Sequence, residues 1–407
     1  MERKKVFVVG SGRSAIGKYQ GSLAGCDPVE VCRQVISASF PQQYLNAVDE
    51  VILGAVLSAG MGQGPARQIA LAAGIPQKVP AYLVGMVCGS GMQALRSAAD
   101  SIRCGASAVL CGGFEFMSNA PYLIDGKMRR GTRMGDQTMK DMMMCDGLVD
   151  AMSGVHMGVT AENIAALLGI TRGEQDAYAY ETNQRAIRAV DEGCFAPEIR
   201  PVEVRQGKQT ILFDADEFPN RTSTPEKLAK LRPAFKQDGT VTAGNSSGLN
   251  DGCAFLLLAD EDWCRMHDVT PVFEIVETTA CGCDPSLMGL GPVDAVKMLL
   301  DRQSLSLGQI ETIELNEAFA AQALGCIRLL CKTYGISEAE MLGKTNCWGS
   351  GIGLGHPLGM SGARLPVTLM TRMQAEQASL GLASLCVGGG MGLATLIRRV
   401  DQSEWLN

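Results

Sequence analysis

Residues 80–105 read PAYLVGMVCGSGMQALRSAADSIRCG, and this stretch decides the fold class. The apolar run that ends at Val87 predicts a buried strand. Apolar residues then recur at helical spacing until a glycine ends the run: Met92, Leu95, Ala99, Ile102 and Gly105. Short strands and helices alternate in the same way through 5–17, 48–60, 107–118 and the final third of the chain. The pattern predicts an α/β fold in which helices cover a sheet.

Cys88 is one of 15 cysteines, and its position sets it apart from the others. It lies where the predicted strand turns into the helix, next to free backbone N–H groups and the positive end of the helix dipole. That environment lowers the pKa of a thiol and favours the reactive thiolate. Gly89 and Gly91 are expected to let a substrate approach the backbone closely. The alternative is a cysteine that only packs as a small apolar residue.

Composition and charge exclude several classes of protein. A net charge of -7 provides no basic patch, so nucleic acid and anionic membranes are poor partners. No apolar run approaches the ~18 residues that span a bilayer, and the first residues lack the apolar core of a signal peptide. An odd number of scattered cysteines argues against a disulfide framework and favours the cytoplasm. Cys281 and Cys283 have no second pair of ligands nearby, so we expect no metal site.

From about Pro121 the sequence is polar, rich in methionine and weakly periodic, which is typical of a long functional excursion over the surface. A helix is expected within this excursion, opened by the capping box at 171–174 and ended by Gly193. The final third repeats the outline of the first. Its CVGGGMGLA (386–394) and the earlier VCGSGMQAL (87–95) both have a cysteine followed by glycines and a methionine. This similarity suggests two similar halves.

Three further stretches contain residues suited to chemistry. GSGIGLGHPLGMSGAR (349–364) places His356 in a glycine-rich turn, and the chain has only three histidines. Cys386 precedes three glycines whose N–H groups could bind an oxyanion. In NEAFAAQ (316–322), Asn316 ends a buried strand and could hold a water or donate to an oxyanion. Each residue taken alone could also be a structural turn residue.

Together these stretches resemble the thiolase family, most closely its biosynthetic acetyl-CoA acetyltransferases. The resemblance covers nearly the whole chain, including 12–24, 112–123, 146–165 and 231–252. It implies two similar α/β halves in a five-layered αβαβα arrangement with an inserted loop domain that covers CoA. We expect an N-terminal half at 1–120 whose sheet is completed by 249–271, a loop domain at 121–248, and a C-terminal half at 272–407.

The resemblance also implies roles for the catalytic residues. Cys88 would be the nucleophile that takes the acyl group as a thioester, and His356 would activate it. Cys386 would be the acid/base that removes a proton from the second acetyl-CoA. Asn316 would hold a water that, with His356, stabilises the enolate oxygen. The N–H groups of Cys88 and Gly388 would form a second oxyanion hole.

For CoA, the resemblance points to six residues of the loop domain and the C-terminal half. They would contact pantetheine, adenine or the acyl group: His156, Met157, Arg221, Phe235, Ser247 and Met288. Arg221 stands beside Asn220, where some family members have a basic residue.

Three departures from the family pattern concern the neighbourhood of the site. Family members usually read Arg-Thr-Pro where this chain has Arg-Ser-Ala at 13–15, and Asn where it has Gly85. Before His356, Trp348 stands where a small polar residue is expected, and Ser350 takes a glycine position. Trp348 is expected to shrink the pocket, alter the loop that carries His356, or contact a neighbouring subunit.

The expected activity is the reversible condensation of two acetyl-CoA into acetoacetyl-CoA and CoA, by a homodimer or homotetramer without a permanently bound cofactor. One alternative is a degradative 3-ketoacyl-CoA thiolase that acts on longer chains. Another is a non-catalytic CoA-binding protein, which the retention of Cys88, His356 and Cys386 disfavours. A ketoacyl synthase would pair its cysteine with two histidines, and Cys386 argues against it.

Overall fold

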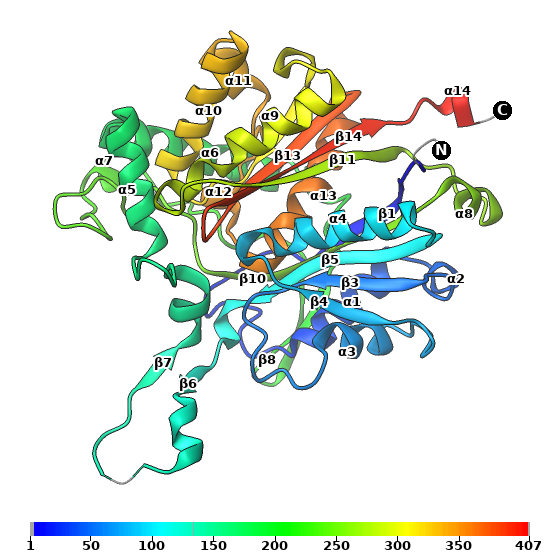
Figure 1. Cartoon of the computed structure of the whole chain (residues 1–407), viewed down its shortest axis with the longest axis horizontal. Coiled ribbons are helices and arrows are strands. Elements are labelled where there is room, and N and C mark those ends of the chain that lie inside the picture. Colours follow the sequence, from blue (N-terminus) through cyan, green and yellow to red (C-terminus); the bar gives the residue numbers. More distant parts are fainter. Residues whose placement is uncertain (1–3, 133, 406–407) are drawn as a thin grey trace.

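The chain forms five layers, in which helices alternate with sheets (Figure 1). The computed structural model describes residues 4–132 and 134–405. The central layer consists of α4 (Ser90–Arg103) and α13 (Leu358–Glu376), which pack on each other and on the strands on both sides. The outer layers contain α1 (Pro28–Ser39) and α3 (Pro65–Ala72) on one side, and α9 (Gly291–Gln303) and α10 (Ala320–Tyr334) on the other. The predicted αβαβα arrangement is confirmed.

The sheet of the N-terminal half has the order β1-β10-β5-β3-β4. Its strands are β1 (Phe7–Arg13), β10 (Asn250–Ala259), β5 (Ala108–Phe116), β3 (Glu50–Gly54) and β4 (Ala81–Val84). β10 runs antiparallel to β1 and β5, whereas β5, β3 and β4 are parallel. A strand that follows the long excursion in sequence therefore lies between β1 and β5 in this sheet.

The C-terminal half repeats the first four positions of that sheet. Its strands are β11 (Phe273–Gly282), β14 (Met391–Arg399), β13 (Leu380–Val387) and β12 (Thr312–Leu315). β14 runs antiparallel to β11 and β13, and β13 is parallel to β12. β1 and β11 pair at Phe7 and Val8, which joins the two parts into one sheet. The same order and the same strand directions support two similar halves.

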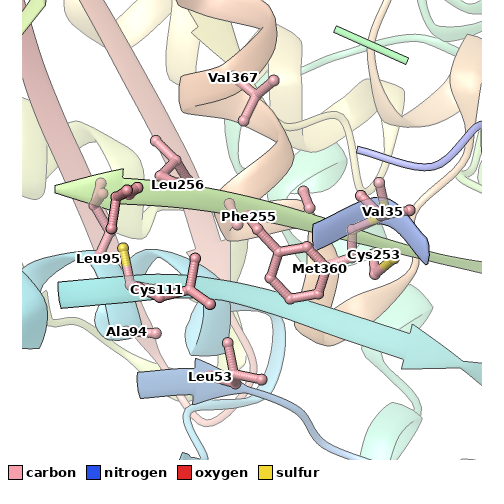
Figure 2. Close-up of a cluster of buried hydrophobic side chains, with 14 of the residues drawn as sticks. Val35, Leu53, Ala94, Leu95, Cys111, Cys253, Phe255, Leu256, Met360 and Val367 are labelled. Atoms are coloured by element: carbon pink, nitrogen blue, oxygen red, sulfur yellow. The ribbon is translucent and has the colours of Figure 1, made fainter. Parts of the chain in front are cut away.

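The core lies between α4, α13 and the strands of the N-terminal half. Figure 2 shows buried side chains of these elements in one cluster, among them Leu95, Cys111, Phe255, Met360 and Val367. Exclusion of this apolar surface from water is the main force that holds the layers together.

Residues 121–248 cover one end of the layers. β6 (Tyr122–Ile124) and β7 (Met139–Asp141) form an antiparallel arm that projects from the body (Figure 1). The helices are α5 (Met157–Leu168), α6 (Arg172–Asp191) and α7 (Pro225–Ala229). The predicted capping box at Thr171 and Glu174 is confirmed. The hairpin of β8 (Val202–Gln206) and β9 (Gln209–Phe213) packs on α1, so part of this excursion contacts the N-terminal half.

The boundaries of the three expected units stay a prediction. Among the helices of the described residues, none is both long and apolar enough to cross a membrane.

Candidate active site

Cys88 lies in a short 3₁₀ turn, η1 (Val87–Gly89), between β4 and the start of α4. Val87 has a φ of 44°, a conformation that is strained for a β-branched residue. Such strain persists only where the surrounding structure imposes it, and it is common at functional sites. The turn packs against α13 and β13, which carry or adjoin other candidate residues. Cys88 itself is half-buried, so solvent can reach this residue.

The pKa of the Cys88 thiol is raised to about 11, because burial outweighs the neighbouring donors. The N–H groups of Gly388 and of Cys88 itself act in the opposite direction and stabilise the thiolate. The expectation of a lowered pKa is therefore wrong, because burial outweighs the effect of the N–H groups at the helix start. At neutral pH the thiol keeps its proton, and a base must remove it before it can act as a nucleophile.

The glycines around Cys88 allow close packing of protein rather than access for substrate. A Cβ at Gly89 would lie 2.7 Å from the Leu393 side chain. At Gly91 it would lie 2.7 Å from the Gly359 carbonyl oxygen, at the start of α13. The expectation that these glycines admit a substrate is wrong, since other parts of the chain already fill the space. The absent side chain of Gly91 lets the starts of α4 and α13 meet, and that of Gly89 leaves room for Leu393 of β14.

His356 lies between α12 (Gly351–Leu354) and α13, and it is buried. Its backbone N–H donates to Asn250 Oδ1 at 2.9 Å. Its ring contacts Ser361 Oγ at 2.6 Å through Nδ1 and Asn316 Nδ2 at 3.4 Å through Nε2. Burial and the positive charge of Arg364 lower the pKa of His356 to about 3. The imidazole is therefore neutral at physiological pH.

The contacts of Ser361 define which ring nitrogen carries the proton. The Ser361 hydroxyl donates to the Pro357 carbonyl oxygen at 2.9 Å, so it must accept from Nδ1–H of His356. Nε2 then keeps its lone pair and accepts from the Asn316 amide. This tautomer presents a base on the side of the ring that faces Asn316.

Asn316 and Cys386 lie at the ends of the neighbouring strands β12 and β13. The Asn316 N–H donates to Ser384 O at 2.9 Å, two residues before Cys386. Asn316 Oδ1 is buried and has no hydrogen-bond partner, which leaves an acceptor for a water or a substrate group. Cys386 is also buried. Burial and the nearby Cys88 thiol raise the pKa of Cys386 well above its usual value.

Comparison with known proteins identifies the family. The model of the thiolase N-terminal domain matches residues 6–262, and that of the thiolase C-terminal domain matches residues 269–399. The chain belongs to the thiolase family. It is 45% identical over 401 residues to a relative from Escherichia coli K12 named acetyl-CoA acetyltransferase, with 98% of this chain and 100% of the relative covered.

Two solved thiolase structures are similar in fold. An acetyl-CoA acetyltransferase from Syntrophomonas wolfei has a TM-score of 0.94 at 40% identity, covering 98% of this chain and 100% of that one. The human mitochondrial 3-ketoacyl-CoA thiolase in complex with CoA has a TM-score of 0.90 at 37% identity, covering 98% of both chains.

Several residues that the thiolase resemblance assigned to CoA lie beside Cys386. Met157 and Met288 pack with Cys386 in one apolar cluster, and Phe235 packs against it. The Phe235 ring stacks on His156 at 4.6 Å between centroids. The Ser247 N–H donates to Ala318 O, two residues after Asn316. These five side chains and Cys386 come from five separate segments, which the fold brings together.

Arg221 is the exception among the candidate CoA residues. It forms an ion pair with Asp191 at 2.6 Å, and both side chains are more than half exposed. It lines a cavity of about 530 Å³ together with Lys18, Asn220 and Ser223. No catalytic candidate lines this cavity, but Ser246 does, next to Ser247.

Trp348 does not enter the catalytic cluster. Its ring contacts the Phe195 ring edge-on at 5.6 Å, and it packs on the core of its own chain. These contacts give Trp348 a packing role in its own chain, and its expected effects on the pocket, the His356 loop or a neighbouring subunit stay predictions. Ser350, in the glycine position, accepts from Arg364 at 3.1 Å. Gly85 is exposed, and a Cβ there would meet nothing within 4 Å.

Sequence reasoning missed three buried polar residues that contact the candidates or their neighbours: Glu115, Ser361 and Glu317. Glu115 stands in the otherwise apolar strand β5, and a buried charge in such a strand is itself a signal. Glu317 accepts from Tyr178, Thr182 and Asn346, which holds the segment that leads to His356. Within the described residues, no group of His, Cys, Asp or Glu is arranged to hold a metal ion.

Proposed function

We propose that this thiolase is an acetyl-CoA C-acetyltransferase that condenses two acetyl-CoA into acetoacetyl-CoA and CoA, reversibly. The observation that supports the proposal is that the turn with Cys88 packs on α13, which follows His356 directly, and on β13, which contains Cys386. The His356 imidazole is neutral and lies next to Asn316. A nucleophile, a base and a second acid/base are the groups that a two-step acyl transfer through a covalent thioester requires.

In the first step, His356 Nε2 takes the Cys88 proton while the sulfur bonds to the thioester carbonyl carbon. The bond between that carbon and the CoA sulfur breaks, and the leaving sulfur receives the proton of Cys386. The N–H groups of Cys88 and Gly388, which act on the Cys88 thiol, would stabilise the oxyanion. The products are acetyl-Cys88, free CoA, a protonated His356 and a Cys386 thiolate.

In the second step, the Cys386 thiolate removes a proton from the methyl group of the second acetyl-CoA. The raised pKa of Cys386 suits this role, because it makes the thiolate a strong base. The free acceptor of Asn316 would hold a water that, with His356, stabilises the enolate oxygen. The new carbanion bonds to the acetyl carbon, and Cys88 leaves as a thiolate that recovers its proton from His356.

CoA would lie along the segments that meet at Cys386. His156, Met157, Phe235, Ser247 and Met288 would contact pantetheine and the acyl group. The cavity beside Arg221 and Lys18 would receive the nucleotide end. Its lining also includes Asp216 and Glu217, so the basic side chains there have to offset acidic neighbours.

We also propose a cytoplasmic homo-oligomer, a homodimer or homotetramer. β4 is an edge strand, and Tyr82 on it is 44% exposed. The arm of β6 and β7 exposes apolar side chains, including Tyr122, Ile124 and Met139. Exposed edges and apolar patches of this kind favour association. Light scattering should give a multiple of 43.2 kDa; a monomer would contradict the assignment.

An assay of thiolysis with acetoacetyl-CoA and with longer 3-ketoacyl-CoAs tests the activity. We expect the highest kcat/KM with acetoacetyl-CoA, because the cluster of Met157, Met288 and Phe319 closes around Cys386. A preference for longer chains would favour the degradative alternative. No turnover with any of them would favour the non-catalytic one.

A further inference from the structure

The start of α13 has no local cap, although it follows His356 directly. Its N-cap residue, Pro357, makes no side-chain hydrogen bond to the helix. The first N–H groups of a helix need acceptors from elsewhere, particularly when they are buried. For α13 this acceptor is Glu115 of β5, whose Oε2 accepts from the Gly359 N–H at 2.9 Å. A strand of the N-terminal half therefore caps the helix next to the imidazole.

The Glu115 carboxylate also binds a third segment. Its oxygens accept from the N–H groups of Val56 and Leu57, at 3.0 and 2.9 Å, in the chain that leaves β3. Glu115 is only 1% exposed, so water does not compete for these bonds. A buried carboxylate that accepts from three backbone donors is held firmly, because such charge-assisted bonds are short and strong. The Glu115 carboxylate therefore links three parts of the chain: β5, the segment after β3 and the start of α13.

The Gly359 peptide has no room to move away from this carboxylate. A Cβ on Gly359 would lie 2.5 Å from Phe114 O and 2.8 Å from Ala55 Cα. A Cβ on Gly113 would lie 2.1 Å from Gly359 O. The backbone around Gly359 is thus enclosed on several sides by other parts of the chain. Its buried N–H group needs an acceptor, and Glu115 provides one.

We propose that Glu115 is the positioning residue that holds His356 in place against Cys88. The inference rests on the proposed function, since it concerns the base of that reaction. Glu115 acts through the peptide of Gly359, three residues after His356, and through the contact of α13 with the turn that carries Cys88. Its oxygens are engaged by backbone donors, so it is a positioning residue and takes no part in proton transfer.

The negative charge of Glu115 also affects the reactivity of Cys88, in the direction opposite to its positioning of His356. Its negative charge raises the pKa of the Cys88 thiol. Removal of the charge alone would therefore make Cys88 more reactive at a given pH. Displacement of His356 would make Cys88 less reactive. The direction of the change in Cys88 reactivity separates the two roles.

Two variants test the proposal, Glu115→Gln and Glu115→Met. The glutamine keeps one oxygen that can accept from Gly359, whereas the methionine has a similar length and no such acceptor. We expect kcat to fall about 10²-fold in E115M, the scale of a small misplacement of a catalytic group, and less in E115Q. The KM for acetoacetyl-CoA should stay within about twofold, because the proposed CoA residues lie on other segments. Alkylation of Cys88 by iodoacetamide should slow in the same order.

Asp49→Asn is the matched control. Asp49 accepts from the backbone N–H groups of Ser107 and Ala108, at the opposite end of β5 from Glu115. It ties the same strand by the same kind of bond, so D49N should keep the wild-type kcat and Cys88 alkylation rate. Thermal unfolding of all three variants shows which of them are folded. If E115M does not fold, E115Q provides the test alone.

Faster alkylation of Cys88 with an unchanged kcat in E115Q would overturn the inference, because Glu115 would then be only a nearby charge. An equal loss of kcat in D49N would also overturn it, because any weakening of β5 would then suffice. Failure of the proposed function looks different: the wild-type enzyme itself would not turn over acetoacetyl-CoA.

Discussion

His356 Nδ1 lies 2.6 Å from the Ser361 hydroxyl oxygen, and that hydroxyl donates to the Pro357 carbonyl. Ser361 lies one helical turn into α13, so the helix itself orients the ring that precedes it. The arrangement places the proton on Nδ1 and the lone pair on Nε2. A second residue of the same helix, Arg364, helps to keep the ring neutral.

We predict that Ser361→Ala leaves the tautomer of His356 undefined and lowers kcat about 10- to 10²-fold, since a base in the wrong tautomer cannot accept the thiol proton. Nitrogen-15 NMR of the histidine ring should show Nδ1–H in the wild type and a mixture in the variant. The wild-type ring should remain neutral from pH 5 to 9, because its pKa lies near 3. Ser361→Thr keeps the hydroxyl and should show the wild-type Nδ1–H signal and the wild-type kcat. An imidazolium signal of the wild type at pH 6 would contradict the assignment.

Cys88→Ala and Cys88→Ser should abolish turnover and leave the fold intact, because the covalent intermediate needs a thiolate. Incubation of the wild type with acetyl-CoA should add one acetyl group at Cys88, as measured by peptide mass spectrometry. Iodoacetamide should label Cys88 more slowly in His356→Ala than in the wild type, because His356 is the base that removes the Cys88 proton. An unchanged labelling rate of Cys88 would argue against this role of His356.

Cys386→Ala should still accept an acetyl group on Cys88 from acetyl-CoA, but more slowly, because the leaving CoA sulfur must take its proton from solvent. Condensation should fall about 10²–10⁴-fold, because no other group is placed to remove the proton of the second substrate. A chase of acetylated enzyme with a second acetyl-CoA, followed by mass spectrometry, separates the two steps. Condensation at the wild-type rate would mean that the Cys386 thiol is only structural.

Trp348→Ala should change stability and leave acyl-chain preference as it is. The ring packs on Phe195 and the core, so its loss should lower the free energy of unfolding by about 2–3 kcal/mol. Urea unfolding measures this change. The ratio of kcat/KM for acetoacetyl-CoA and a six-carbon substrate should match the wild type; a shift toward the longer chain would place Trp348 in the pocket after all.

Burial raises the pKa of Glu115 to about 7 from an ordinary value of 4.5. The folded state therefore binds this proton more tightly than the unfolded state. Its contribution to stability is fully present below about pH 4.5 and is lost as the pH rises through 7. Relative to Glu115→Gln, the wild type should lose roughly 3 kcal/mol of unfolding free energy over this range. Denaturant titrations at pH 5 and pH 8 measure the difference; no change between them would contradict the buried carboxylate.

Local patterns in the sequence were sufficient for much of the fold. The strand and helix around Cys88 and the capping box at Thr171 were both predicted. Periodicity and capping depend on residues within a few positions of one another, so one sequence contains them. The order of the four motifs identified the family, and the family implied the five layers.

Properties that depend on distant segments were decided only by the tertiary structure. The pKa of Cys88 was expected to fall, but segments from other parts of the chain bury the thiol and raise it. Gly91 was expected to admit a substrate, but α13 fills that space. Glu115 and Gly359, 244 positions apart, form the bond that caps α13. Desolvation and backbone packing depend on all the atoms that surround a group in space. Many of these atoms belong to residues far away in the sequence, so a local sequence pattern does not reveal them.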